Sequence, residues 1–488
     1  MLDAMPSFTE RYHELTKYRP ETIDRLGEVH WQEQPAPFKE IAAAKQVDLV
    51  PSLKSALSNI ESFPDKAAPW LQEQALPALC RLLYYTLGIT ARMSGGGAGE
   101  MFLRAAPSAG GLYPTEVYVV CREFSDLPAG IYHYHSLRSA LIPVWEGDFS
   151  ADLWHHFLDH PAARESRCMI LFTGLYGRGA WRYKERAYRR ILLDTGHAAA
   201  NMVEIARVMG LDVVSLGGFL DDGLEELLFL GNKEEFPLLG LALGPAQTLT
   251  PPGGQRPSLP PPVAVKRVET SDPMQVQQNT CERLYKDQPL RPSAREIPCT
   301  LRFDTAVFNP QSVIVRRRST RRFTGDPIPL QDVEDMIRFA FRQEGYEYRL
   351  APGQLEFHVA ILAVEGKEPG IYSLNPETLH WTLKKAGDFR EEIMGICLGQ
   401  ELGRDCAFAL LYTSDMSALV STYGDRGYRY ACLDAGQIGE RIQLWALHKG
   451  FGSSGIGGYY DDWANEVFGL PLSHGVLYLT VTGVPEDE

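Results

Sequence analysis

The stretch RAYRRILLDTGHAAANMVEIARVMGLDVVSLGGFLDD, residues 186–222, returns later in the chain as RGYRYACLDAGQIGERIQLWALHKGFGSSGIGGYYDD, residues 426–462. The two stretches are identical at 12 of 37 positions, with a constant offset of 240 residues and no gap, which is far above chance. At the same offset, AGIYHY from Ala129 matches PGIYSL from Pro369. The sequence therefore predicts two tandem copies of one domain.

Both copies show the same order of predicted helices and strands. Apolar residues recur at helical spacing between Ala198 and Met209 and again between Ile438 and Trp445, and a glycine follows each run. Gly210 and Gly450 stand where a helix C-terminus favours glycine. The predicted strands are 117–121, 168–173 and 237–243 in the first copy and 357–364, 406–412 and 476–481 in the second. Because helices and strands mix throughout, we expect an α+β fold.

The composition divides the chain into four parts. Residues 246–263, AQTLTPPGGQRPSLPPPV, hold too much proline and glycine for a helix or strand. The predicted parts are an N-terminal extension (1–66), a first domain (67–245), a proline-rich linker and bridge (246–313) and a second domain (314–488).

Charge and hydropathy exclude several classes of protein. The 488 residues carry a net charge of -14, which argues against a broad surface for nucleic acid or anionic membranes. No apolar run approaches the ~20 residues of a membrane span, and no signal peptide is evident, so we expect a cytoplasmic protein. The eight cysteines form no CxxC pair, which favours reduced thiols. HHFLDH, 155–160, lacks a defined third ligand, and we expect no metal site.

Two segments have the composition of ligand-binding elements. VRRRSTRRFTGDPIP, from Val315, holds five arginines within seven residues, together with two hydroxyl side chains suited to a phosphate. A solvated charged strip is the alternative. RAAPSAGGLYPTE, from Arg104, places two glycines ahead of a predicted strand, whereas RLAPGQLEF, from Arg349, keeps the arginine and proline but lacks the glycine pair. Glycine lets a backbone approach a ligand closely.

The order of these motifs resembles the nitroreductase family. The shared features are an Arg-Arg-Ser-x-Arg-x-Phe start, a Pro-Ser-x-Gly-Gly loop, and a long helix that ends in glycine before a strand and a Gly-Gly pair. YHELTK (12–17), QPAPFK (34–39), APSAGGLYPTE (106–116) and ERAYRRILLDTGHAAANM (185–202) look like the SagB-type dehydrogenase branch. The resemblance covers nearly all of the chain, and the bridge least well.

This resemblance implies an α+β fold that binds FMN at a two-fold interface between domains. A flavin needs cations at its phosphate, close backbone approach along its ring edge and a peptide N–H near N5. The implied FMN-binding residues are Arg317, Arg318, Ser319 and Arg321, the loop of Pro107, Ser108, Ala109, Gly110 and Gly111, and Ser454, Gly457 and Gly458 on the N5 side. No GxGxxG segment follows a predicted strand, so we expect FMN rather than FAD.

The two halves of one flavin site stand on different copies. The second copy owns the arginine cluster and the N5-side loop, and the first copy owns the Pro-Ser-x-Gly-Gly loop. The complementary site would need an arginine start in the first copy and a glycine loop in the second, and neither is present. We therefore predict an intrachain pseudo-dimer with one FMN per chain, a monomer in solution with a dimer left open.

The resemblance also points to a place for proton transfer. In relatives that oxidise azolines, a Lys-Tyr pair before the long helix is thought to remove the substrate proton. Here Arg182 and Tyr183 align with that pair, and Lys184 follows one place later. Because arginine is a poor base, either Tyr183 and Lys184 act in a shifted register or the chain does not oxidise azolines. A third reading makes all three surface residues.

The predicted function is that of an FMN-dependent oxidoreductase. It would transfer a hydride between flavin N5 and a small molecule or a modified peptide, and some members of the branch aromatise thiazoline or oxazoline rings. One alternative is a nitro or quinone reductase with NAD(P)H as the electron donor. The other is a scaffold that binds flavin without catalysis.

Overall fold

The computed structural model describes residues 6–21, 23, 30–42, 45–58, 75–95, 99–230, 234–244, 308–342 and 350–486. The linker and bridge predicted for 246–313 lie outside the described residues up to residue 307. Among the described helices, none has the length and apolar character needed to cross a membrane.

Two antiparallel sheets form the centres of the two domains. The first sheet has the order β1-β6-β5-β4-β7-β9-β8 and the second β14-β13-β11-β15-β17-β16. The strands of the first are β1 (Val47–Asp48), β4 (Thr115–Cys121), β5 (Gly130–His135), β6 (Ala140–Glu146), β7 (Cys168–Leu175), β8 (Val213–Leu216) and β9 (Glu235–Leu243). Those of the second are β11 (Glu356–Ile361), β13 (Gly370–Asn375), β14 (His380–Ala386), β15 (Phe408–Asp415), β16 (Gly452–Ile456) and β17 (His474–Gly483).

Helices cover both sheets. The helices of the N-terminal region and first domain are α1 (Phe8–Leu15), α2 (Val50–Leu57), α4 (Leu76–Leu87), α5 (Ser150–His156), α6 (Pro161–Glu165), α7 (Tyr176–Tyr183), α8 (Ala187–Val208) and α9 (Asp221–Leu227). Those of the second domain are α11 (Pro310–Arg316), α12 (Leu330–Phe341), α14 (Arg390–Ile396), α15 (Leu402–Asp405), α16 (Met416–Tyr423), α17 (Gly427–His448) and α18 (Asp461–Phe468). Two small sheets complete the fold, β2 (Ile89–Gly95) with β3 (Gly99–Arg104) and β10 (Ile328–Pro329) with β12 (Val364–Glu365).

The tandem repeat and the α+β class are confirmed. The helices α8 and α17 begin and end at positions 240 residues apart, as do α7 and α16. Gly210 and Gly450, predicted to end the long helices, follow them with left-handed φ values of 70° and 85°. Such values suit glycine because it has no Cβ.

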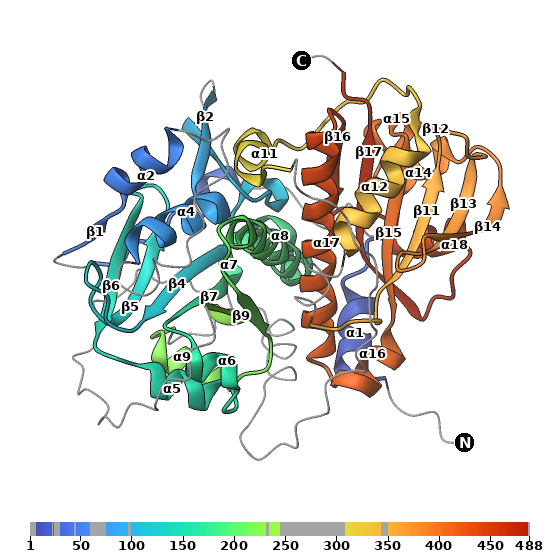
Figure 1. Ribbon diagram of the computed structural model, residues 1–488. Helices are drawn as coiled ribbons and strands as arrows, with labels where there is room; N and C mark the ends of the chain where they lie inside the picture. The colour runs from blue at the N-terminus through green and yellow to red at the C-terminus, as the bar shows by residue number, and fades with distance from the viewer. Residues whose placement is uncertain are drawn as a thin grey trace.

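The long helices α8 and α17 lie side by side between the two domains (Figure 1). A Cβ added to Gly196 would come 2.3 Å from the carbonyl oxygen of Leu433 on the other helix. The converse also holds, because a Cβ on Gly436 would come 2.3 Å from the carbonyl oxygen of Leu193. The glycine shared by the two repeats is therefore what allows the backbones to touch.

Reciprocal ion pairs flank this crossing. Asp461 of the second domain accepts hydrogen bonds from Arg186 and Arg189 of the first, at 2.7 and 2.9 Å. In the opposite sense, Asp221 pairs with Arg426 at 2.6 Å and with Arg429 at 3.0 Å. All six side chains are buried. These pairs join the domains as a pseudo-dimer within one chain.

The acidic pairs at 221 and 461 begin the helices α9 and α18. Their first members have a second role that the sequence reading missed, because each neutralises two arginines of the other domain. The signal was present in the alignment, since the Arg-x-x-Arg and Asp-Asp pairs recur together at the same offset.

The N-terminal segment contacts both domains. In Figure 1, α1 lies beside α16 and α17, far from the next elements of its own sequence. The Tyr12 hydroxyl donates to the carbonyl oxygen of Glu185 at 2.7 Å, and the Thr9 N–H donates to Asp425 at 2.9 Å. Further along, β1 pairs with β6 and so joins the first sheet. Residues of the predicted 1–66 extension thus take part in both halves of the fold.

Candidate functional site

Arg317, a residue of the second-domain arginine cluster, contacts the first domain. It follows α11, is 4% exposed, and its Nε donates to the carbonyl oxygen of Ala105 at 3.0 Å. Ala105 stands two residues before the Pro-Ser-x-Gly-Gly loop. Second-domain cations and the first-domain loop, which are more than 200 residues apart in sequence, therefore meet at the domain interface.

The other predicted residues of the cluster are more exposed. Arg318 is exposed and donates to the Thr90 hydroxyl on β2 at 3.3 Å. Ser319 is partly buried and Arg321 is exposed. These three side chains would be accessible to a ligand that approaches from outside Arg317.

The loop of Pro107 to Gly111 is fixed by a buried acid. The Ser108 hydroxyl and the Ala109 N–H both donate to the carboxylate of Asp194 on α8. Gly110 and Gly111 have φ values of 64° and 67°, which side-chain-bearing residues rarely adopt. A Cβ on Gly111 would meet nothing within 4 Å. Both glycines thus serve the turn, and Gly111 leaves an open approach to the backbone.

Of the three proton-transfer candidates, Tyr183 lies closest to this loop. Its hydroxyl is 2.5 Å from the position that a Cβ on Gly110 would take. An Arg182 guanidinium nitrogen is 3.1 Å from the same position. Lys184 is exposed and has a φ of 48°. The fold brings Tyr183 and Arg182 to the loop, and no contact of this kind is seen for the Lys184 side chain.

The N5-side segment reaches the same region from the second domain. A Cβ on Gly457 would lie 3.6 Å from the guanidinium carbon of Arg190, which is an ordinary contact distance. One on Gly458 would lie 3.5 Å from a guanidinium nitrogen of Arg190. Ser454, on β16, is buried. The three predicted segments therefore converge across the interface, with Arg190 among them.

Buried polar atoms test whether these residues fit a flavin nucleotide. Nη1 of Arg317 and Oγ of Ser454 are buried, and neither has a hydrogen-bond partner in the described part of the chain. Buried donors of this kind are normally satisfied, and an orphaned one costs free energy. Phosphate, ribityl and ring oxygens are acceptors that would satisfy them. The residues present fit the group.

The interface also holds titratable residues that the sequence motifs did not identify as ligands. Nε2 of His197 lies 3.0 Å from the Tyr478 hydroxyl of the second domain, and Nδ1 lies 2.7 Å from the Leu193 carbonyl oxygen. Burial lowers the pKa of His197 to about 4, and the Arg317 charge acts in the same direction. This geometry is that of a structural hydrogen-bonding residue. The only sequence signal was its replacement by Gln437 in the other repeat.

Two buried acids share this environment. Burial raises the pKa of Asp194 to about 7, although Ser108 and the Ala109 N–H oppose the shift. Burial likewise raises the pKa of Glu440 to about 7, against the charge of Arg317, whose Nε lies 3.9 Å from the carboxylate. Both carboxyls would hold or release a proton near neutral pH.

The pseudo-symmetric position in the other half is filled. Gly217 corresponds to Gly457, but a Cβ on it would lie 2.7 Å from the Tyr430 ring and 3.0 Å from Leu350. Tyr430 itself stands where the first domain has Arg190.

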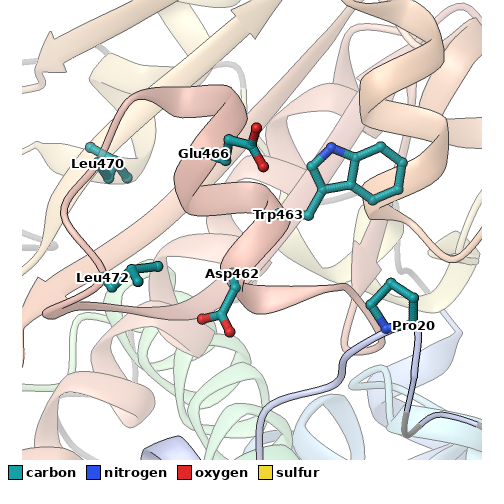
Figure 2. Close-up of a pocket in the computed structure, with 6 residues that line it drawn as sticks. All are labelled: Pro20, Asp462, Trp463, Glu466, Leu470 and Leu472. Carbon is teal, nitrogen blue, oxygen red and sulfur yellow. The ribbon is translucent and has the colours of Figure 1, made fainter.

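Two surface cavities lie away from these residues. One, of about 610 Å³, is lined by Pro20, Asp462, Trp463, Glu466, Leu470 and Leu472. Figure 2 shows its side chains, three of them on α18. Another, of about 350 Å³, adjoins residues 351–358 and β13. Neither is lined by a predicted flavin residue, so the site is marked by converging buried polar groups rather than by these volumes.

Known proteins resemble the chain over both halves. The profile described as "Nitroreductase family" matches residues 73–245 and 314–484. A crystal structure of a "putative nitroreductase" from Anabaena variabilis is similar over 98% of this chain and 100% of its own, at 33% identity and a TM-score of 0.83.

Curated relatives match shorter stretches. "Putative nitroreductase MJ1384" of Methanocaldococcus jannaschii is 27% identical over 169 residues, which make up 35% of this chain and 80% of that protein. "Trifolitoxin-processing protein TfxB" of Rhizobium leguminosarum bv. trifolii is 30% identical over 171 residues, 34% of this chain and 46% of that protein. Because the family profile matches both domains and the Anabaena structure matches nearly the whole chain, this protein belongs to the nitroreductase family.

Proposed function

We propose that this chain is an FMN-dependent oxidoreductase that holds one flavin between its two domains and transfers a hydride to or from a small-molecule or peptide substrate. The observation that carries the proposal is the meeting of Arg317, from the second domain, with the chain leading into the first-domain glycine loop. Family membership supports the same class of chemistry.

The arginine cluster would hold the phosphate. Arg317 has a buried nitrogen without a partner in the described residues, and the residues that follow it, Arg318, Ser319 and Arg321, are all more exposed than Arg317. Arginine forks suit phosphate oxygens, and hydrogen bonds to charged groups contribute about 1.5–3 kcal/mol each. The loop from Pro107 to Gly111 would lie along one side of the ring system, and the backbone of Gly457 and Gly458 along the other. When bound, FMN supplies a two-electron carrier.

Tyr183 is the best-placed group for moving the substrate proton. It lies against Gly110, and two guanidinium groups face its ring, with the Arg190 carbon 3.5 Å and the Arg182 carbon 5.6 Å from the centroid. The shifted register with Lys184 receives no such support from contacts.

The substrate class rests on relatives. TfxB is named for processing trifolitoxin, and by analogy this chain would act on a modified peptide or a small molecule. The second candidate, a nitro or quinone reductase driven by NAD(P)H, is favoured by the Anabaena similarity, which carries the nitroreductase description over the whole chain.

The first experiment measures the cofactor. We expect FMN, not FAD, in the mass spectrum of material released from the purified protein, at about one FMN per chain. Arg318→Ala and Arg321→Ala should each weaken FMN binding about tenfold or more, as the loss of a charge-assisted hydrogen bond predicts. Arg322→Ala, an exposed arginine of the same segment, is the matched control and should retain full occupancy. FAD as the main species, or a ratio near two, would contradict the proposal.

A second experiment addresses direction and catalysis. Anaerobic titration with NADH and NADPH should bleach the flavin if the reductase reading is right. Flavin bleached by dithionite but by no substrate would favour a scaffold. Once a substrate is found, Tyr183→Phe should slow turnover while FMN occupancy stays unchanged, and Lys184→Ala should have little effect.

A further inference from the structure

Arg190 occupies the point where three segments of the chain meet. It is 8% exposed, its guanidinium carbon lies 3.5 Å from the centre of the Tyr183 ring, and a Cβ on Gly457 would lie 3.6 Å from the same carbon. Nη2 donates to the hydroxyl of Tyr18, from the N-terminal segment, at 3.2 Å. Both domains and the N-terminal segment thus hold this one guanidinium in place.

The positive charge at Arg190 has no paired carboxylate in its hydrogen-bonded contacts. Its Nε is buried and lacks a hydrogen-bond partner within the described ranges. Asp461 already pairs with Arg186 and Arg189. Asp194, one helical turn further along α8, has its charged form stabilised by Arg190, but it accepts hydrogen bonds from the glycine loop, and burial still raises its pKa to about 7. Asp194 is therefore an incomplete counter-ion, and an incompletely paired buried charge is costly, so such a group is retained where an anion can reach it.

The corresponding position in the other half makes the contrast sharper. Tyr430 stands there, and with Leu350 it fills the space beside Gly217. Arg190 leaves ordinary contact distance beside Gly457. The cation is therefore found on the side of the interface where the flavin ligands converge, and an uncharged ring is found on the other.

Arg190 is also separate from the proposed phosphate cluster. The charge of Arg317 acts on His197, which lies seven residues beyond Arg190 on α8. At 1.5 Å per residue, that is about 10 Å along the helix. Arg317 contacts the chain ahead of the glycine loop at Ala105, whereas Arg190 contacts Tyr18 and Tyr183, so the two guanidinium groups have different neighbours and Arg190 offers a second place for an anion.

We propose that Arg190 recognises an anionic group of the substrate, a carboxylate, and that Tyr18 and Tyr183 orient its guanidinium for this contact. The inference rests on the proposed oxidoreductase function and names the substrate class of that site. Arginine suits the role because its fork matches the two oxygens of a carboxylate.

Benzoate and its neutral isostere benzamide are the probes. Their binding to the purified flavin-containing protein is measured by calorimetry and by the change in flavin absorbance. We expect benzoate to bind at least about tenfold more tightly than benzamide, because a hydrogen-bonded charge pair is at stake. Arg190→Gln should abolish this preference with the FMN-to-chain ratio unchanged, and Tyr18→Phe should weaken it several-fold.

Each other outcome overturns the proposal. Equal binding of the two probes to the unmodified protein, or a preference that survives in Arg190→Gln, would show that Arg190 does not read a carboxylate. Loss of FMN from Arg190→Gln would make Arg190 a cofactor ligand instead. The proposed function fails differently, through absence of flavin from the unmodified protein, and calorimetry reports the probe preference whether or not flavin is present.

Discussion

Asp194 links the glycine loop to α8 through a single carboxyl group. Its pKa is raised from 3.8 to about 7, mainly by burial. Between these values the folded protein keeps the proton and the unfolded chain releases it. The contribution of Asp194 to stability is therefore complete below pH ~4 and is lost as the pH rises through 7.

Replacing Asp194 tests whether its contribution to stability decreases as the pH rises. Asp194→Asn keeps an acceptor for Ser108 and Ala109 but cannot titrate. We expect the melting temperature of the unmodified protein, relative to that of Asp194→Asn, to fall as the pH is raised from 5 to 8. Glu440 and His197 titrate in both proteins, so they cancel in the difference. A difference that stays constant or grows with pH would contradict the assignment.

At the residue scale, the sequence identified the glycine loop but not Asp194, the side chain that holds the loop in place. Gly110 and Gly111 could be read from the chain because positive φ is a local demand of backbone sterics. Asp194 could not be assigned as their anchor, since it lies more than 80 residues away and nothing local distinguishes it from a solvated helix acid.

At the scale of elements, the crossing of α8 and α17 depends on two glycines. Gly196 and Gly436 touch each other's backbones, and a Cβ on either would clash with a carbonyl oxygen of the partner helix. Backbone atoms of a buried helix cannot move aside as a flexible side chain can, so the helices themselves would have to separate.

Replacing either glycine by alanine tests this contact, because helix propensity and the expected clash change the melting temperature in opposite directions. Glycine to alanine in a helix interior ordinarily stabilises by about 1 kcal/mol. We expect Gly196→Ala to lower the melting temperature instead, and Gly436→Ala to do the same, because each Cβ would lie 2.3 Å from a backbone oxygen. Thermal unfolding measured by circular dichroism gives the answer. A raised melting temperature for either variant would mean that the helices are not held at this distance.

At the scale of the whole molecule, two similar domains produce unequal halves of the interface. Reciprocal ion pairs at Asp221 and Asp461 preserve the two-fold relation. The side chains beside Gly217 and Gly457 do not preserve it, because Tyr430 and Leu350 fill one side and Arg190 lies at contact distance on the other. A duplicated and fused dimer can lose one site without losing its interface.

This inequality predicts the result of opening the filled side. Leu350→Ala removes one of the two groups that press on Gly217. We expect the FMN content to stay near one per chain, because that side still lacks an arginine cluster to bind phosphate. Absorbance and protein concentration give the ratio. A ratio that rises towards two would show that packing, rather than missing cations, excludes a second flavin.

The sequence by itself determined the repeat, the order of helices and strands, and the family. These features are periodic or local: hydrophobic spacing follows the geometry of a helix or strand, glycine marks backbone that other residues avoid, and a repeat needs only comparison of the chain with itself.

Only the tertiary structure decided which distant groups meet. The pairing of Asp461 with Arg186 and Arg189, the contact between Gly196 and Gly436, and the passage of Tyr18 to Arg190 join residues that are about 170 or more positions apart. Which residues become partners depends on how the two folded domains and the N-terminal segment pack together. That packing pairs the buried charges of Asp461, Arg186 and Arg189 across the interface, and no local stretch of sequence encodes it.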